Sequence, residues 1–468
     1  MVASPARPAL VAGCSLAWLL LAALAAPAPG RAQTGAAGAL AAPSAAAPPS
    51  PEESQIDPPE WEDIPELAVD PPPPVEAGLR LHDAPSLETV GQTPQPIVGR
   101  AAFGDGVTFD AGDTFSLQVR ARLQFRVALA HPGSGAIDAG APPGLFSEIL
   151  IRRARLVFAG HAFVRELQYY IQLGVAPLDM EQDLLIPLRD ARLTWQLHRD
   201  FGIRVGQMKV PLGQQRVISS SALQFVDRSI VTTELNLDRD IGLYFLSEDL
   251  FGLGGILGYE IGVFGGRGRN RFGALDAAMF VGRIQISPFG AFEWRTEPDF
   301  SRSMQPRMAI GLGAAYNIDS NRRRGTHEQV FRVARFDYLH LGADVSFKWA
   351  GLSVLAEAMF READAPSGSG EIDGALVTEY SRSAWGWFAQ LGYMLPFPVE
   401  LAARYGEIRP LEGNAPEASF FLQRELGGAV SIYAQEHALK LQLDYFYYFG
   451  DAPRAERHQV RLQAQLFF

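Results

Sequence analysis

Cysteine and lysine are almost absent from this chain of 468 residues. The single cysteine, Cys14, excludes a disulfide within one chain. Only three lysines occur, so arginine carries nearly all the positive charge, and its planar guanidinium suits bidentate contacts with anions. A GC-rich genome would produce the same bias. Beyond the N-terminus no run of about 18 apolar residues occurs, so no helix of the body is expected to span a bilayer.

Motifs of catalysis are also absent. The sequence has no metal-spaced cluster of histidine and cysteine, no GxSxG motif and no phosphate-binding P-loop. The seven histidines after residue 100 are dispersed. We therefore expect a protein that is not an enzyme and needs no cofactor or metal.

The charge is divided unevenly along the chain. Residues 1–100 hold four basic and eleven acidic residues, which accounts for most of the net charge of −11. Residues 101–468 hold 37 basic and 41 acidic residues and are close to neutral. This division predicts an acidic N-terminal part that is distinct from the body of the protein.

The N-terminal part has two predicted segments. Arg7 precedes an apolar run from residue 9 to residue 26, and small residues follow up to Ala32, which predicts a secretory signal peptide at residues 1–32. Cys14 lies inside the apolar run, so a lipoprotein cleavage box is not favoured. Residues 33–100 are rich in proline, alanine and acidic residues, which predicts a disordered, extended linker.

The last twelve residues, RHQVRLQAQLFF, alternate with period 2. Val460, Leu462 and Leu466 fall on one face of an extended strand, whereas Arg461 and Gln463 fall on the other. Guanidinium groups need water or anions in front of them rather than a dry core. The pattern therefore indicates a strand with lipid on one side and water on the other, although one such strand alone would also fit a soluble β protein.

The same alternation recurs along residues 101–468 and predicts an all-β fold, a closed antiparallel transmembrane β-barrel of about sixteen strands. Short connections alternate with long ones, as periplasmic turns and external loops do in outer-membrane barrels. Residues 288–307 break this rule, because a short turn is expected there. The predicted strands start near residues 114, 153, 167, 190, 201, 240, 257, 278, 308, 338, 352, 384, 399, 425, 439 and 457.

Several segments resemble the phosphate-selective porin O and P family of bacterial outer membranes. The strongest pair is VGQMKVPLG at Val205–Gly213 followed by RDIGLYF at Arg239–Phe245. The resemblance covers residues 103–468 and implies a sixteen-stranded, trimeric channel, but a preference for phosphate does not transfer with the family name. Further matching segments are IRRARL (Ile151–Leu156), VDRS (Val226–Ser229), GVFGGRGRN (Gly262–Asn270), VGRIQISPFG (Val281–Gly290), LGAAYN (Leu312–Asn317) and HALKLQLDYFYYF (His437–Phe449).

Selectivity of such a channel depends on charges along its wall and its inward loops. The predicted inward face carries fourteen basic and nine acidic residues. The predicted constriction loop, residues 211–238 with the adjoining Arg239, contributes Arg216, Asp227, Arg228 and Arg239. The predicted pore-lining residues that contact anions are Arg120, Arg122, Arg126, Arg153, Arg155, Arg192, Arg204, Arg457 and Arg461.

The predicted function is passive diffusion of small hydrophilic solutes through the outer membrane, with a preference for anions such as phosphate. A non-selective general porin, in which acidic loop residues oppose the arginine wall, is the first alternative. A plugged barrel acting as a surface receptor or anchor is another. A remote alternative is an outer-membrane hydrolase, for which His340 and Ser346 are the nearest inward pair. The expected partners are outer-membrane lipid, small anions and two further copies in a homotrimer, with no nucleic acid, and the linker is expected in the periplasm.

Overall fold

A computed structural model describes residues 96–468, except residues 182–183, 273–276, 292, 416–419 and 453–454. The predicted signal peptide, residues 1–32, lies outside the described residues, as does the predicted linker apart from residues 96–100.

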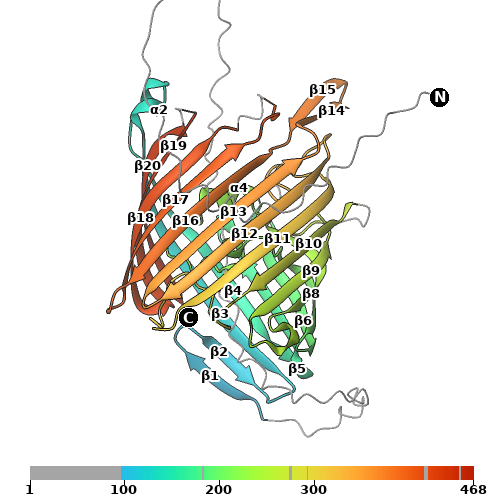
Figure 1. Cartoon of the computed structure of the whole chain (residues 1–468), viewed down its shortest axis with the longest axis vertical. Coiled ribbons are helices and arrows are strands. Elements are labelled where there is room, and N and C mark those ends of the chain that lie inside the picture. The colour runs from blue at the N-terminus through green and yellow to red at the C-terminus, as the bar shows by residue number, and fades with distance from the viewer. Residues whose placement is uncertain (1–95, 182–183, 273–276, 292, 416–419, 453–454) are drawn as a thin grey trace, which may run out of the picture. The chain divides into compact units, whose positions relative to one another are not determined.

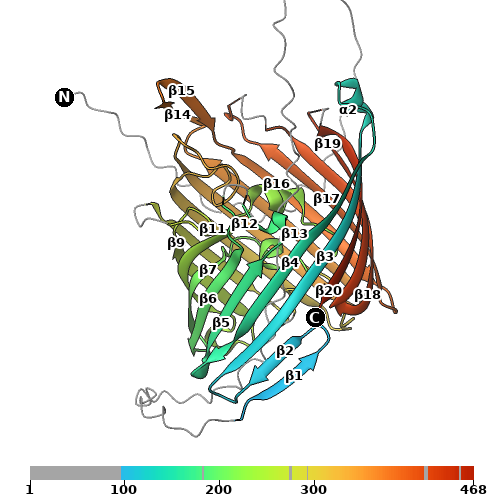
Figure 2. The same cartoon turned by 180° about the vertical axis from the view of Figure 1, so that it is seen from behind.

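Sixteen antiparallel strands close into a barrel, which confirms the predicted fold class (Figure 1). Each barrel strand pairs with the next along the chain, and β20 closes the ring against β3, from Arg457 opposite Pro132 to Phe467 opposite Arg122 (Figure 2). Closure pairs the backbone groups that an open sheet edge would leave exposed to lipid. The barrel strands are β3 (Ser116–Pro132), β4 (Phe146–Ala162), β5 (Val164–Gly174), β6 (Leu188–His198), β7 (Phe201–Lys209), β8 (Arg239–Ser247), β9 (Leu257–Phe264), β10 (Met279–Ile286), β11 (Arg307–Ser320), β12 (Phe336–Trp349), β13 (Leu352–Ala363), β16 (Ala384–Met394), β17 (Val399–Pro410), β18 (Gln423–His437), β19 (Leu439–Gly450) and β20 (Arg457–Phe467).

The two faces of the strands differ as the alternation predicts. On β20, Val460 and Leu462 are exposed on the outer face, whereas Arg461 and Gln463 are buried inside the barrel. An apolar outer face and a polar inner face are the distribution that lipid outside and water inside require.

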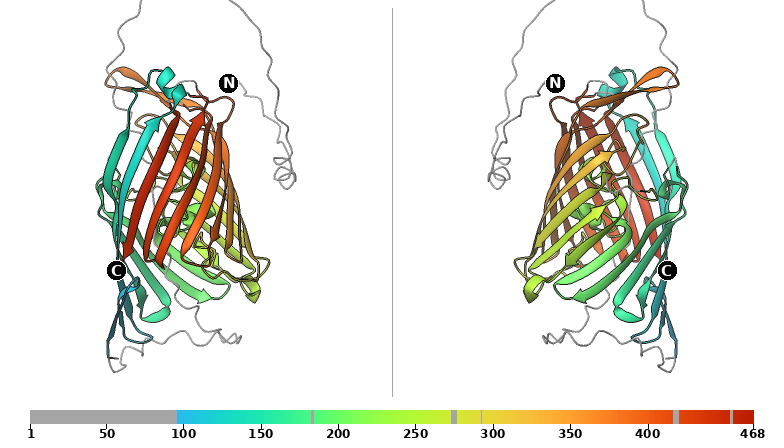
Figure 3. Two further views of the ribbon diagram at one scale, coloured as in Figure 1. Left: turned by 90° about the vertical axis from the view of Figure 1, so that its left-hand side faces the viewer. Right: turned by 90° about the vertical axis from the view of Figure 1, so that its right-hand side faces the viewer.

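The two ends of the barrel carry connections of different length (Figure 3). At one end, here called the short-turn end, β4 and β5 are joined by Phe163 alone, and β12 and β13 by Ala350 and Gly351. The other end, the long-loop end, carries the longer connections, such as residues 175–187 and 321–335. Residues 287–306, between β10 and β11, are the exception that the sequence predicts, because they lie at the short-turn end and are long.

Two hairpins lie outside the ring and were not predicted. β1 (Val98–Ala102) and β2 (Gly106–Asp110) form one. β2 also pairs with Ser116–Val119 at the start of β3, which precede the residues of β3 that pair with β20. β14 (Ser367–Ile372) and β15 (Ala375–Tyr380) form the other within a long loop. The sequence SGSGEI of β14 lacks the apolar alternation by which the barrel strands were recognised.

The helical elements of the described residues are short. They are α2 (Ser134–Asp138), α3 (Gln214–Val217), α4 (Ile230–Leu235) and the 3₁₀ turns η2 (Pro177–Asp179) and η3 (Leu250–Gly252). None of the helices within residues 96–468, as far as they are described, is long and apolar enough to cross a membrane.

Residues 210–238, between β7 and β8, fold into the barrel and are called the interior loop. The loop carries α3 and α4, and α4 lies against β13, β16 and β17. Leu223, Leu235 and Leu237 of the loop belong to a buried apolar cluster with Leu355 and Phe388 of the wall. Close approach requires glycine on the wall, because a Cβ at Gly313 would lie 2.3 Å from the carbonyl oxygen of Leu212. The interior loop therefore packs against the inner wall from β11 to β17, and its Phe225 packs against Ala429 of β18 and Phe446 of β19.

Candidate functional site

The predicted arginine wall faces the inside of the barrel on β3 to β7 and β20. Three of its members, Arg192, Arg204 and Arg457, are half-buried. The other six are almost fully buried: Arg120, Arg122, Arg126, Arg153, Arg155 and Arg461.

Two β-bulges bring further arginines to this wall, Arg152 and Arg189, which the alternation does not reveal. The pairing of β3 with β4 skips Arg152, because Gln124 pairs with Arg153 and Phe125 pairs with Ile151. The pairing of β5 with β6 likewise skips Arg189. Both side chains are fully buried. A bulge shifts the alternation by one residue, so two consecutive side chains can turn inward.

Asp227, at the tip of the interior loop, lies among four arginines of the wall. Its carboxylate oxygens are 2.7 Å from Arg126, 3.1 Å from Arg461, 3.6 Å from Arg153 and 4.0 Å from Arg152. Burial alone would raise the pKa of the Asp227 carboxyl, but Arg126 and Arg461 hold the pKa well below its ordinary value. The acidic loop residue therefore contacts the arginine wall directly and anchors the loop there, rather than opposing the wall across an opening.

The other predicted constriction residues hold the interior loop in place. Arg228 donates from Nε to the carbonyl oxygen of Gln215, 2.9 Å away, and so crosslinks the loop to itself. Arg216 pairs with Asp238 inside the loop. Arg239 is the first residue of β8 and pairs with Asp190 of β6 at 3.0 Å.

Acidic side chains of the long loops are each surrounded by several arginines. Asp179 lies 2.6 Å from Arg155 and 3.7 Å from Arg189. Glu181 contacts three arginines at 2.9–3.2 Å, and Glu234 contacts another three at 2.7–3.2 Å. Glu328 adds a second carboxylate to the arginines around Glu234, 2.9 Å from Arg324. Among the described side chains of these clusters, guanidinium groups still outnumber carboxylates. The arginines of Glu181 are Arg269, Arg271 and Arg322, and those of Glu234 are Arg324, Arg361 and Arg382.

The pKa values of these loop carboxylates determine how the stability of the porin depends on pH. Burial favours the neutral acid, but the neighbouring arginines outweigh it, lowering the pKa of Glu234 to about 2 and the pKa of Glu181 below its ordinary value. A lowered pKa in the folded state stabilises the fold above the ordinary pKa of about 4.3, and this stabilisation is lost as the pH falls through the folded value. We expect the contribution of these two carboxylates to the thermal midpoint to be constant between pH 8 and pH 5 and to fall between about pH 4 and pH 2.

The titration can be checked by following folded and unfolded bands on gels after heating at each pH. The variant Glu234→Gln should have a lower midpoint at neutral pH and a weaker fall in acid. An unchanged acid response in this variant would contradict the assignment of the transition to this cluster.

Arg192 and Arg204 are held by aromatic and hydroxyl groups. The guanidinium of Arg204 donates to Thr194 Oγ1 at 2.8 Å and to the Tyr244 hydroxyl at 2.6 Å. The guanidinium carbon of Arg192 lies 4.7 Å from the ring centre of Tyr170. These contacts orient both guanidinium groups on the inner wall.

Residues 287–306, here called the inserted connection, reach across the short-turn end of the barrel. Thr296 Oγ1 lies 2.7 Å from His437 Nε2 of β18, and the Lys348 ammonium of β12 donates to the carbonyl oxygen of Glu293 at 2.6 Å. The carboxylate of Glu297 accepts from the Gln215 side chain at 3.1 Å and from the Gln224 backbone N–H at 2.7 Å. The inserted connection and the interior loop therefore hold each other inside the barrel.

The variant Glu297→Gln is expected to lower stability by about 1–3 kcal/mol, because an amide nitrogen cannot accept the hydrogen bond of a buried N–H. We also expect larger fluctuations of single-channel current, since the inserted connection loses a contact with the interior loop. Glu248→Gln is the matched control, because its exposed pair with Arg295 should contribute little. Equal thermal midpoints for the two variants would contradict this role of Glu297.

The inward side chains of β12 offer no hydrolytic site. His340 and Ser346 are buried but lie six residues apart on one strand, roughly 20 Å at 3.3 Å per residue. A serine nucleophile and its base need hydrogen-bond contact. Within the part of the chain that the structure describes, no group of three or more His, Cys, Asp and Glu side chains could hold a metal ion.

The sequence profile described as phosphate-selective porin O and P matches residues 144–445, well over half of the chain. The chain belongs to this family. This porin is therefore an outer-membrane channel rather than an enzyme. Because outer-membrane barrels have short turns on the periplasmic side, the short-turn end is the periplasmic end. No curated protein matches the chain.

Several solved porins align with most of the chain at low sequence identity. The anion-selective porin from Comamonas acidovorans is 10% identical, with a TM-score of 0.48 over 76% of this chain and 100% of that chain. A complex of Salmonella typhi OmpF with daunomycin is 13% identical, with a TM-score of 0.47 over 75% and 98%. The channel DcaP of Acinetobacter baumannii is 12% identical, with a TM-score of 0.46 over 75% and 97%.

Proposed function

We propose that this porin lets small hydrophilic anions diffuse through the outer membrane more readily than cations of similar size. The excess of inward-facing arginine on the wall from β3 to β7 carries the proposal. It is supported by the loop clusters, where Asp227 lies among four arginines and Glu181 and Glu234 each contact three. A wall with more fixed positive than negative charge raises the local concentration of anions.

The proposed path runs beside β5 to β8. The contacts of the inserted connection described above lie on β12, β18 and the interior loop, and α4 packs against β13, β16 and β17. Arg192 and Arg204 lie on the opposite side and keep part of their surface exposed. Tyr170 and Tyr244 orient the two guanidinium groups on the inner wall, where a passing anion can meet them.

Phosphate is proposed as one permeant anion among several rather than as a dedicated substrate. Strict phosphate recognition needs several donors converging on one anion, whereas many of these arginines already bind loop carboxylates. A general porin without selectivity is the competing function. It is favoured by the direct pairing of Asp227 and Asp444 with wall arginines, which neutralises part of the wall.

The reversal potential of a planar bilayer under a KCl gradient tests the proposal. We expect its sign to show chloride preference, and added phosphate should carry current without blocking it for long periods. Zero reversal potential would favour the general porin, and absence of current would favour a plugged barrel that serves as a receptor or anchor.

The assembly and the N-terminal segments complete the proposal. We propose that three copies form a homotrimer, that residues 1–32 are removed as a signal peptide, and that residues 33–100 form a periplasmic linker. Native mass spectrometry of the purified porin measures both the number of chains and the mass of the mature N-terminus.

A further inference from the structure

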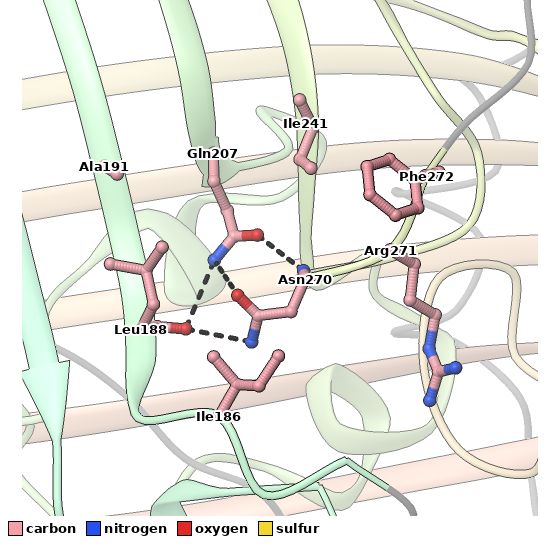
Figure 4. Close-up of a pocket in the computed structure, with 8 residues that line it drawn as sticks. All are labelled: Ile186, Leu188, Ala191, Gln207, Ile241, Asn270, Arg271 and Phe272. Atoms are coloured by element: carbon pink, nitrogen blue, oxygen red, sulfur yellow. Dashed lines mark hydrogen bonds between the residues drawn. The ribbon is translucent and has the colours of Figure 1, made fainter.

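The polar side chains that line a small pocket at the long-loop end of the barrel satisfy one another. In this pocket, shown in Figure 4, the Gln207 nitrogen donates to Asn270 Oδ1 at 3.0 Å, and the Gln207 oxygen accepts from the Asn270 backbone N–H at 2.6 Å. The Asn270 nitrogen donates to the carbonyl oxygen of Leu188 at 3.1 Å. Polar groups that are shielded from water are normally paired in this way, so a shielded nitrogen without a partner is unusual.

His437, at the periplasmic end of the barrel, has such a nitrogen. The residue lies in the turn between β18 and β19, beyond their last cross-strand pair, Gln435 and Leu439. Its Nε2 lies 2.7 Å from Thr296 Oγ1 of the inserted connection, whereas its Nδ1 is shielded from solvent and has no hydrogen-bond partner in the described part of the chain. Both nitrogens of an imidazolium are donors, so protonation of His437 would leave the Nδ1–H without an acceptor.

Two ammonium groups near His437 oppose a further positive charge there. Lys440 of β19 donates to the carbonyl oxygen of Leu223 at 3.0 Å, and Lys348 of β12 donates to that of Glu293 at 2.6 Å. Burial, Lys440 and Lys348 together hold the pKa of His437 well below its ordinary value of about 6.5. The contact between the turn and the inserted connection therefore favours the neutral imidazole.

The carboxylates of the same region are held by other donors. Among the described residues, none of them accepts a hydrogen bond from the imidazole. Glu436, next to His437 in the turn, and Glu293 of the inserted connection are exposed. The buried carboxylates and their donors are Glu297 with the Gln224 backbone N–H at 2.7 Å, Glu400 with the Tyr433 hydroxyl at 2.6 Å, and Asp299 with the Gly351 backbone N–H at 2.7 Å.

The inserted connection meets the turn through two side chains. Besides the contact of Thr296, Phe300 packs edge-on against the imidazole, with the ring centres 4.9 Å apart. The connection is also bound by the backbone N–H groups of Ala350 and Gly351, in the turn between β12 and β13. Backbone amides do not change charge between pH 5 and pH 8, whereas an imidazole does. Mild acid therefore acts on the contact at His437.

We propose that His437 and residues 293–306 form an acid-released latch across the periplasmic mouth of the channel. At neutral pH the uncharged imidazole binds Thr296 and Phe300, and the segment stays in place. In acid the detached turn binds a proton that the latched turn excludes. The population of the detached segment therefore rises by up to about ten-fold for each pH unit below about 6.5. Detachment widens the periplasmic exit, whichever ion the channel prefers.

Single-channel recordings in planar bilayers at pH 7.5, 6.5 and 5 test the latch. Wild type should show brief current steps above its main level that occupy up to about thirty-fold more time at pH 5 than at pH 6.5. His437→Gln keeps an uncharged group that can bind Thr296, so it should show no such increase. The matched control is His198→Gln, because His198 is exposed in the turn between β6 and β7 and should leave the response of wild type unchanged.

A second variant and a second measurement test the latch if His437→Gln folds poorly. Thr296→Val loses the hydroxyl that meets the imidazole, so its upward steps should be about five-fold more frequent at pH 7.5. In wild type, hydrogen–deuterium exchange corrected for the chemical rate should show that residues 293–302 lose protection at pH 5, whereas residues 425–432 of β18 keep it.

Three results would overturn the proposal. Wild type without upward steps in acid, or with closures instead, would show that residues 293–306 do not leave the mouth. An equal acid response of His437→Gln and wild type would assign the titration to another group. Unchanged protection of residues 293–302 at pH 5 would show that the segment stays bound when the imidazole is exposed to acid.

Discussion

Replacing Asp227 by asparagine is expected to destabilise the porin by about 3–5 kcal/mol, because the change removes a negative partner that several buried guanidinium groups share. Arg126 and Arg153 contact the Asp227 carboxylate directly. Without this carboxylate, Arg461 retains its pair with Asp444. The tip of the interior loop should detach from the wall formed by β3, β4 and β20. Gel mobility after heating gives the stability, and bilayer recordings give the conductance.

The same variant should raise the anion-to-cation permeability ratio, because it removes one negative charge from beside Arg126 and Arg461 of the inner wall. Asp200→Asn is the matched control, since Asp200 pairs with Arg199 in an exposed turn and should affect neither stability nor selectivity. A variant Asp227→Asn that is as stable as wild type would show that Asp227 does not anchor the loop.

Replacing Arg192 and Arg204 together by glutamine is expected to cause the largest loss of selectivity. The two side chains are half-buried, and Tyr170, Thr194 and Tyr244 orient them on the inner wall. If anions pass beside them, the permeability ratio should fall by about five- to twenty-fold, because each charge contributes about 1 kcal/mol at about 4 Å. The reversal potential should then approach zero, while the conductance for neutral solutes stays close to that of wild type.

The control for this double variant is Arg165→Gln with Arg199→Gln. Arg165 lies at the periplasmic start of β5 and Arg199 in the turn between β6 and β7; both are exposed and pair with acids at the surface. Salt screens such exposed charges, so the control should keep the selectivity of wild type. A loss of selectivity in the control that equals the loss in the double variant would mean that the wall beside β6 and β7 does not select the ion.

The sequence predicts the barrel well because every barrel strand meets lipid on one face. Val460 and Leu462 must alternate with Arg461 and Gln463, and that alternation is visible without the fold. It fails where the backbone departs from a regular strand. Arg152 and Arg189 occupy bulges, and a bulge follows from the pairing of two strands rather than from the sequence of one.

The interior contacts could not be predicted from the sequence. Asp227 meets Arg461 across 234 residues of chain, and Glu297 meets Gln215 across 82. Nothing in the local sequence specifies either contact, because each depends on how a loop folds inside the closed ring. The unusual length of residues 287–306 was the one visible sign that the periplasmic end carries an additional element.

The most direct test of the central claim is modification of a cysteine placed at Arg204. In a chain whose only natural cysteine, Cys14, is replaced by serine, Arg204→Cys should react with a small anionic methanethiosulfonate added to the bath. The account predicts that the attached negative charge turns the selectivity towards cations and reduces the chloride current. Unchanged current and selectivity after verified modification would show that ions do not pass beside the arginine wall.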